Sequence, residues 1–326
     1  MRGTTSWLDA TVRATRDLTP SIREIEIVPD GLSPTWLPGS HVEVAVDVDG
    51  RADTRCYSLV GEPDGSCFRI AVKREQPSRG GSRYMWSLAP PARLRVTEPR
   101  NLFELELGRA EYLLVAGGIG ITPILGMALA LARRGARVRM LYACRSRGEA
   151  AYLPELTAAL GERLAFFDGS RGERIDLGTE MAALAADAQV YLCGPLRLLD
   201  ACRGLWTASG RRPSELRYET FANSGRHAPE PFWLRLPDRD AEISVPADKT
   251  ALDALAEAGI EVMADCRRGE CGLCMVDVIG LTGEIDHRDV FLSEHQKQAN
   301  TKLCTCVSRV VGGGATVDTG YRSDAI

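Results

Sequence analysis

Three cysteines in one short segment constrain this chain more than any other feature. Cys266, Cys271 and Cys274 have the spacing C-x4-C-x2-C, and two more cysteines follow further along. With a distant fourth cysteine, this is the spacing by which plant-type sites hold a [2Fe–2S] cluster. A zinc knuckle and buried free thiols are the alternatives, but zinc sites prefer paired short arms and often use histidine, which this loop lacks. The loop therefore predicts an iron–sulfur site.

The spacing leaves the fourth cluster ligand open between Cys304 and Cys306. Both lie about thirty residues after Cys274, and the ferredoxin count favours Cys304. An insertion in the intervening loop costs little entropy, so length alone cannot choose between them. Gly269 and Gly272 let the backbone wrap closely and direct N–H groups at the cluster sulfurs.

Length and charge bound the rest of the chain. Its 326 residues exceed what one hydrophobic core usually serves, which predicts two or three domains. A net charge of −4 argues against a non-specific nucleic-acid binder. No apolar run reaches the length of a membrane span, and the first residues lack the apolar core of a signal peptide. We therefore expect a cytoplasmic protein that binds neither nucleic acid nor membrane.

The hydrophobic pattern changes along the chain and predicts three folds. From Leu8 to about Leu107, the segments IREIEIV, HVEVAVDV, CFRIAVK and RLRVTEP alternate with period two, which predicts a small antiparallel β-barrel. From Glu111, apolar strands alternate with helical segments, which is typical of an α/β domain with a parallel sheet.

After these two domains, RYETFANSGRHAPEPF is polar and rich in Pro and Gly, which predicts a linker. A hairpin, FWLRLPDRDAEISVPA, and a short helix, TALDALAEAG, then precede the cysteine loop. We expect domains at residues 1–108 and 109–222, a linker at 223–235 and a third domain at 236–326.

A glycine-rich turn opens the α/β domain. Gly117, Gly118 and Gly120 follow a strand and precede a helix, with Thr122 as the expected N-cap and Pro123 at the first helical position. Such a turn brings a pyrophosphate to a helix N-terminus, where free N–H groups and the dipole favour anions. A tight βα turn without a ligand is the alternative, because the full GxGxxG pattern is absent.

The predicted barrel carries a second possible phosphate site. Arg79, Gly80, Gly81 and Ser82 supply a guanidinium, flexible backbone N–H groups and a hydroxyl. Upstream, Tyr57 and Ser58 end an extended segment and suit the cover and the polar edge of an aromatic ring. Each feature taken alone also suits a core residue or a surface loop, so the argument depends on their occurring together in this order.

Together these motifs resemble the phthalate dioxygenase reductase family, including the oxidoreductase subunits of vanillate demethylase-type systems. The likeness covers the whole chain through RCYSL, IAVKR, RGGS, PRNLFEL, VAGGIGITP, YACRSRGEAAY, YLCGP, the cysteine loop, DHRD and CVSR. It implies a multidomain fold: a β-barrel flavin domain, an α/β nucleotide domain and an α+β ferredoxin domain of the β-grasp type. One departure is Asp265, where relatives usually carry Ser; the added charge is expected to lower the cluster potential.

The resemblance also implies site residues. FMN is expected at Arg55, Tyr57, Ser58, Leu59, Val72, Lys73, Gly80, Gly81 and Ser82, with Thr122 and Phe221 beside it. NADH is expected at Gly118, Gly120, Arg145, Cys193, Gly194 and Pro195. The cluster is expected on Cys266, Cys271, Cys274 and Cys306, the last because CVSR matches the family segment. Arg145 and Arg147 follow the second strand of the α/β domain, where a 2′-phosphate is met in other folds, but the family implies NADH over NADPH.

The implied function is that of a monomeric reductase component, which moves electrons from NADH through FMN and the [2Fe–2S] cluster to a terminal oxygenase of the Rieske type. Hydride transfer depends mainly on orientation, so we assign no catalytic acid–base residues. A reductase for a cytochrome P450 or another one-electron acceptor is the main alternative. A non-catalytic iron–sulfur sensor or scaffold is a remote one, because a sensor needs no flavin or nucleotide site.

Overall fold

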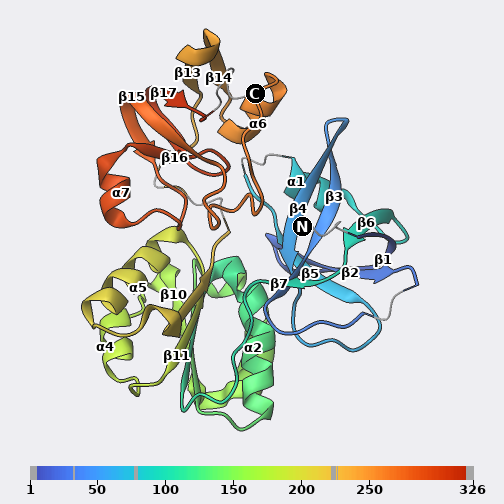
Figure 1. Cartoon of the computed structure of the whole chain (residues 1–326). Coiled ribbons are helices and arrows are strands. Elements are labelled where there is room, and N and C mark those ends of the chain that lie inside the picture. The colour runs from blue at the N-terminus through green and yellow to red at the C-terminus, as the bar shows by residue number, and fades with distance from the viewer. Residues whose placement is uncertain (1–5, 32–33, 77–79, 222–224, 226, 321–326) are drawn as a thin grey trace. The chain divides into compact units, whose positions relative to one another are not determined.

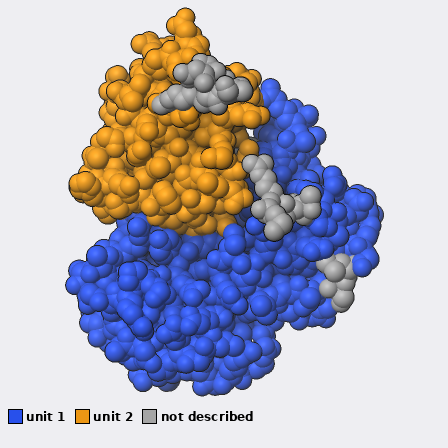
Figure 2. Space-filling view, viewed as in Figure 1, with its two compact units in different colours: residues 1–219 blue, residues 220–326 orange. Residues whose placement is uncertain are grey.

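The computed structural model describes residues 6–31, 34–76, 80–221, 225 and 227–320. The chain divides into two compact units, Met1–Glu219 and Thr220–Ile326, which Figure 2 colours separately. The first unit contains two sheets and the second contains one. None of the helices in the described part of the chain is long and apolar enough to cross a membrane.

An antiparallel, barrel-like sheet forms the first half of unit 1 (Figure 1). Its strands are β1 (Trp7–Thr19), β2 (Ile22–Pro29), β3 (Ser40–Val48), β4 (Arg51–Ser58), β5 (Phe68–Lys73), β6 (Arg93–Thr97) and β7 (Arg100–Asn101). They are ordered β4-β3-β6-β1-β2-β5, and β7 pairs with β3. A bridge between Leu59 and Ile70 links the chain after β4 to β5, so the two ends of the sheet meet.

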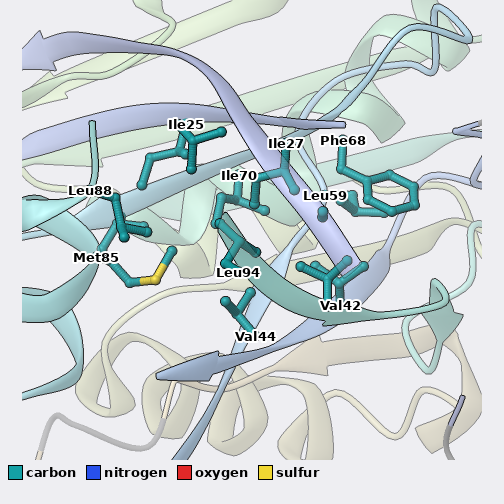
Figure 3. Packing of buried hydrophobic residues seen from close by; sticks show 14 of the residues in the cluster. Ile25, Ile27, Val42, Val44, Leu59, Phe68, Ile70, Met85, Leu88 and Leu94 are labelled. Atoms are coloured by element: carbon teal, nitrogen blue, oxygen red, sulfur yellow. The ribbon is translucent and has the colours of Figure 1, made fainter. Parts of the chain in front are cut away.

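Alternating apolar residues fill the barrel, as the period of two predicted (Figure 3). Ile25, Ile70 and Phe68 are fully buried in this core, and Ile25 on β2 lies opposite Ile70 on β5. Helix α1 (Gly81–Ser87) adds Met85 to this core. The sequence analysis missed α1, because the helix begins inside the RGGS motif, at Gly81, and is only about two turns long.

A parallel sheet forms the second half of unit 1. Its strands are β8 (Tyr112–Gly117), β9 (Val138–Cys144), β10 (Leu164–Asp168), β11 (Gln189–Cys193) and β12 (Leu216–Glu219), ordered β10-β9-β8-β11-β12. The connecting helices are α2 (Ile121–Arg133), α3 (Leu153–Leu160), α4 (Leu177–Ala182) and α5 (Leu196–Ala208). The chain moves outward from β8 to β10 and then returns to β11, so the strand order reverses between β8 and β11. Ligands of such sheets bind at the carboxyl ends of the strands at this switch point.

Unit 2 is a mixed sheet covered by short helices. Its strands are β13 (Phe232–Leu236), β14 (Ala241–Val245), β15 (Met275–Asp286), β16 (Lys302–Cys304) and β17 (Arg309–Asp318), ordered β14-β13-β17-β15-β16. β13 runs parallel to β17 and the other pairs are antiparallel. The helices are α6 (Ala251–Glu257), capped by the Thr250 hydroxyl, and α7 (Glu294–Ala299).

Short 3-10 turns complete the connections: η1 (Gly118–Gly120), η2 (Arg147–Glu149), η3 (Gly161–Arg163), η4 (Gly169–Arg171), η5 (Pro213–Glu215) and η6 (Pro237–Arg239). The fold class predicted from the sequence is confirmed in all three parts: an antiparallel barrel, a parallel α/β layer and a β-grasp-like α+β unit.

The predicted linker is shorter in the structure than in the sequence analysis. The polar segment RYE at its start forms β12, an edge strand that needs burial on fewer sides than the central strands. At the other end, β13 begins at Phe232, inside the range 223–235 assigned to the linker. Phe232, Leu234 and Leu236 alternate into the core of unit 2, which explains the earlier start.

Candidate cofactor sites

The predicted cluster cysteines come together at one end of unit 2. Cys266, Cys271 and Cys274 lie on the irregular segment between α6 and β15, and Cys306 follows β16. The Sγ atoms of Cys274 and Cys306 are 3.1 Å apart. The Sγ atom of Cys266 accepts N–H hydrogen bonds from Arg268, Glu270 and Cys271, each at 3.4 Å. Backbone N–H groups aimed at sulfur stabilise thiolates of the kind that bind iron.

The cysteines form two groups. Cys266 hydrogen-bonds to Cys271, and Cys274 hydrogen-bonds to both Cys304 and Cys306. A [2Fe–2S] cluster is bound by four thiolates shared between two irons, and these cysteines can supply them.

Two glycines shape this loop in conformations that other residues rarely adopt. Gly269 has φ +75°, and a Cβ there would lie 2.9 Å from the Asp289 Cα. Gly272 has φ +73°, and a Cβ there would lie 2.4 Å from the ring of Phe291. Both therefore need glycine for backbone conformation and for space, as the sequence analysis expected for a loop that wraps a cluster.

Both candidates for the fourth ligand lie beside Cys274. Hydrogen bonds from the thiols of Cys304 and then Cys306 lower the pKa of Cys274 to about 3, so the structure favours a thiolate at this position. Cys304 belongs to β16, opposite Met275 in the β15 register, and is fully buried. Cys306 lies beyond the strand, and its sulfur is the one at 3.1 Å.

In unit 1, the glycine turn after β8 packs directly against the loop after β11. A Cβ on Gly120 would lie 2.2 Å from the Cys193 carbonyl oxygen, and one on Gly117 would lie 2.5 Å from Pro195 Cδ. A Cβ on Gly194 would lie 3.1 Å from the Gly117 Cα. The two loops that were expected to hold NADH therefore meet, backbone to backbone, at the switch point of the sheet. The arrangement leaves backbone groups and not bulky side chains facing a ligand there, which suits a pyrophosphate.

The predicted capping role of Thr122 is wrong. Helix α2 begins at Ile121, its N-cap is Gly120, and the Thr122 hydroxyl donates to the Ile119 carbonyl at 3.0 Å. Pro123 consequently lies in the first turn but not at its first position, where its missing N–H still costs nothing because the first four N–H groups of a helix have no partner within it. Thr122 is buried.

Arg145 and Arg147 differ in their surroundings. Arg145 is exposed directly after β9, at the carboxyl edge of the sheet, and the loop after β10 approaches its backbone at Gly169. The guanidinium of Arg147 lies over the Phe166 ring, 5.4 Å from the ring centroid. The backbone N–H of Arg147 donates to the Asp168 carboxylate. Arg145 is therefore the arginine better placed to meet a nucleotide.

The expected flavin residues of the barrel gather around the ends of β4 and β5 and the start of α1. Arg55 on β4 lies against the helix start, since a Cβ on Gly81 would be 2.4 Å from its Nε atom. Gly80, with φ +88°, turns the chain into α1. A guanidinium beside a glycine turn is a donor set for phosphate. Arg55 also pairs with Asp53 at 2.5 Å, a partner that the sequence analysis did not consider.

The remaining flavin candidates have the following positions. Tyr57 and Ser58 end β4, Leu59 bridges to Ile70, Val72 and Lys73 end β5, and Ser82 in α1 accepts an N–H from Glu75. Burial raises the pKa of Tyr57, so its hydroxyl stays protonated. Arg79 lies outside the described residues. Phe221 belongs to the second unit, whereas the other flavin candidates belong to the first.

Sequence reasoning missed Glu219, the last residue of β12. Its carboxylate accepts a hydrogen bond of 3.4 Å from the Ser58 hydroxyl, and both side chains are buried. A second bond of this kind joins the Tyr152 hydroxyl to Glu24 at 2.8 Å. Both link the barrel to the parallel layer, so the flavin candidates and the nucleotide candidates belong to one packed unit. In the sequence, the YETF segment, which contains Glu219 and the flavin candidate Phe221, was the feature that could have pointed to Glu219.

Comparison with known proteins agrees with this arrangement. A family profile described as "2Fe-2S iron-sulfur cluster binding domain" matches residues 235–311, and one described as "Oxidoreductase NAD-binding domain" matches residues 114–204. The chain is 39% identical to the heme-dependent oxidative N-demethylase beta subunit of Ectopseudomonas mendocina (strain ymp), over 95% of this chain and 98% of that protein. It is 33% identical to the vanillate O-demethylase oxidoreductase of Pseudomonas sp. (strain HR199 / DSM 7063), over 95% and 99% of the two chains.

Among solved structures, phthalate dioxygenase reductase, described as a modular structure for electron transfer from pyridine nucleotides to [2Fe–2S], matches with a TM-score of 0.74 and 29% identity. The match covers 96% of this chain and 98% of that one. Such coverage leaves only a few per cent of either chain without a counterpart, so the order of the domains is shared as well as their folds. The chain therefore belongs to the phthalate dioxygenase reductase family, the flavin-, NAD- and [2Fe–2S]-dependent reductase components of oxygenase systems.

Proposed function

We propose that this reductase binds NADH at the switch point between β8 and β11 and delivers electrons to a Rieske-type oxygenase through a cluster on Cys266, Cys271, Cys274 and Cys306. The single observation that carries the proposal is the presence, in one chain, of a nucleotide-type backbone turn and a group of cysteine thiols with the spacing of a [2Fe–2S] site. A nucleotide donor gives two electrons as hydride, a [2Fe–2S] cluster takes one, and a flavin between them exchanges both.

The protein groups in this scheme bind and orient. The turn at Gly118 and Gly120 presents N–H groups at the start of α2, and Arg145 lies at the same edge of the sheet. Arg55 and the N–H groups of Gly80 and Gly81 form the phosphate end of the flavin site, which supports FMN. Ser58, fixed by Glu219, is suited to hydrogen-bond the polar edge of the flavin ring. No general acid or base is required, because orientation is the main demand of hydride transfer.

The type of oxygenase is the open choice within this function. The vanillate O-demethylase oxidoreductase supports an acceptor of the Rieske type, which we favour. The relative from Ectopseudomonas mendocina (strain ymp) is named as part of a heme-dependent N-demethylase, and at 39% identity it makes a heme acceptor the second candidate. The cluster transfers one electron at a time, and both kinds of acceptor can take electrons in this way.

We further propose domain limits of 1–108 for the flavin domain and 109–222 for the nucleotide domain, and a ferredoxin domain that begins with β13 at Phe232 instead of residue 236, which shortens the linker before it. We also propose a monomer in the cytoplasm, where reduced thiols are available to bind iron. Size-exclusion chromatography with light scattering tests the monomer.

The test of the function is anaerobic reduction followed by transfer. NADH should bleach the flavin absorption of the purified protein and produce the electron paramagnetic resonance signal of a reduced [2Fe–2S] cluster. An oxidised Rieske oxygenase should then reoxidise the reductase faster than a heme oxygenase does. Reoxidation only by the heme oxygenase would instead support the heme acceptor. A protein whose flavin NADH does not bleach would refute the proposed function.

A further inference from the structure

Two motifs of unit 2 contain residues to which the electron path described above gives no role. DHRD, Asp286 to Asp289, begins at the last residue of β15, and CVSR continues from the proposed ligand Cys306 to Arg309, the first residue of β17. The antiparallel register pairs Asp286 with Arg309, which brings the two motifs side by side. All four residues of DHRD are buried. Burying charged groups costs free energy unless they are paired or hydrogen-bonded, so this cluster must be organised by specific contacts.

Asp289 makes those contacts on the side of Cys306. Its side chain is fully buried; Oδ1 accepts the Ser308 hydroxyl at 3.0 Å and Oδ2 accepts the Leu292 N–H at 2.9 Å. The Ser308 oxygen in turn accepts the backbone N–H of Arg288 at 3.1 Å. The carboxylate thus holds the chain just beyond Cys306 against the end of the DHRD motif.

Asp289 also adjoins the loop that carries the other cysteines. The N–H of Val290 donates to the Gly269 carbonyl at 2.9 Å. A Cβ on Gly269 would lie 2.9 Å from the Asp289 Cα, and Gly269 lies between Cys266 and Cys271 in the chain. One buried residue therefore contacts both segments that supply the cluster thiols.

The two carboxylates of the DHRD motif differ in how their charge is balanced. Asp286 forms an ion pair with Arg288, whose Nη2 is 2.7 Å from its Oδ2. Among the described residues no arginine pairs with Asp289; its nearest basic side chain is His287, whose Nδ1 is 3.5 Å from Oδ1. Burial opposes ionisation, but hydrogen bonds from His287 and Leu292 and the charge of Lys297 outweigh it and lower the pKa of Asp289. Asp289 is therefore a buried carboxylate without the arginine partner that Asp286 has.

Asp289 lies beside both segments that carry the cluster cysteines, through its hydrogen bond with Ser308 and its close approach to the backbone of Gly269. A negative charge held beside a cluster opposes the electron that the cluster gains on reduction. In a buried site, where the effective dielectric is low, this opposition is stronger than at the surface.

We propose that Asp289 is a positioning residue of the cluster site, which ties the Gly269 loop to the Cys306 segment through Ser308 and lowers the reduction potential of the cluster by its buried charge. The proposal rests on the proposed cluster ligands. It gives the DHRD motif a role that is separate from cysteine ligation and from acceptor binding.

The test is Asp289→Asn in the full-length protein. The amide keeps the shape, accepts the Leu292 N–H through its oxygen and donates to the Ser308 oxygen through its nitrogen, so the charge is lost while the contacts with Leu292 and Ser308 are kept. We expect unchanged iron and sulfide content and a reduction potential shifted upward, measured by mediator titration followed by electron paramagnetic resonance. Neither readout needs NADH or an oxygenase.

Two control variants separate charge from architecture. Asp265→Asn removes an exposed carboxylate next to Cys266 and should shift the potential less than Asp289→Asn, because water screens it. Ser308→Ala keeps the charge but breaks one tie, so it should leave the potential close to that of the wild type while iron is lost to a chelator several-fold faster.

An Asp289→Asn protein with the wild-type potential, or one that cannot hold the cluster despite its conserved hydrogen bonds, would overturn the role of the charge. If the Ser308→Ala protein loses iron no faster than the wild type, the Asp289–Ser308 hydrogen bond does not hold the Cys306 segment in place. If the wild-type protein itself holds no [2Fe–2S] cluster, the proposed function is wrong, and this inference, which rests on it, is wrong as well.

Discussion

The glycine turn of unit 1 and the cysteine loop of unit 2 both depend on glycine, but for different reasons. In unit 1, Gly120 lets two backbone loops touch at the ends of buried parallel strands, so the sheet itself builds the site. In unit 2, Gly269 and Gly272 lie on an irregular segment between α6 and β15, where sulfur atoms and buried side chains hold the backbone. A backbone turn at the end of a sheet needs no ligand to form, whereas folding of a loop that holds a metal is generally coupled to binding of the metal.

The largest expected effect separates the two candidates for the fourth ligand. Cys306→Ser should abolish the cluster, because the Cys306 sulfur completes a pair with Cys274, while Cys304→Ser should leave most of the cluster in place. Iron content and visible absorption measure both variants, and flavin content serves as the control for unit 1. A cluster that survives Cys306→Ser and disappears in Cys304→Ser would make Cys304 the ligand.

The next effect tests whether the sheet builds the nucleotide site. Gly120→Val places side-chain atoms where the Cys193 carbonyl lies and should lower kcat/KM for NADH by about tenfold or more, since overpacking costs about 1–3 kcal/mol. The [2Fe–2S] spectrum should not change. Gly135→Ala is the matched control: Gly135 has φ +66° and open space around its Cα, so it should cost stability but not affinity for NADH. An equal change of the KM for NADH in both variants would contradict the claim that the contact between the two loops builds the nucleotide site.

An effect of comparable size is expected at the flavin phosphate. Arg55→Ala should weaken flavin binding by about 10–100-fold, because a hydrogen bond to a charged group contributes about 1.5–3 kcal/mol. Asp53→Asn should strengthen it, since Asp53 pairs with the same guanidinium. Equilibrium titration of the flavin-free protein measures both, and chromatography of the released flavin should identify FMN. Release of FAD, or weaker binding in Asp53→Asn, would show that Arg55 does not serve the phosphate.

The smallest effect concerns the choice of nucleotide. NADH should have a higher kcat/KM than NADPH, and Arg145→Ala should reduce the remaining activity with NADPH more than the activity with NADH. Arg147→Ala should change this ratio less, because its guanidinium lies over Phe166. Steady-state kinetics with both nucleotides decides the point; a clear preference for NADPH would refute it.

Sequence reasoning succeeded where one pattern determined one structure. Alternating residues predicted the barrel and the glycine turn predicted the strand–turn–helix at β8 and α2, although the helix starts before Thr122 because Gly120 takes the N-cap position. It missed β12, whose polar residues suit an edge strand, and hence Glu219. It also could not find the contact between Asp289 and Ser308, because long-range pairing of β15 with β17 creates it.

The central claim is that electrons leave the protein through the cluster, and a full-length variant without the cluster tests it most directly. Cys271→Ser should oxidise NADH with ferricyanide at close to the wild-type rate, because ferricyanide can be reduced at the flavin. The same variant should fail to reduce cytochrome c, which takes electrons singly from the cluster. Reduction of cytochrome c at the wild-type rate by this cluster-free protein would contradict the account.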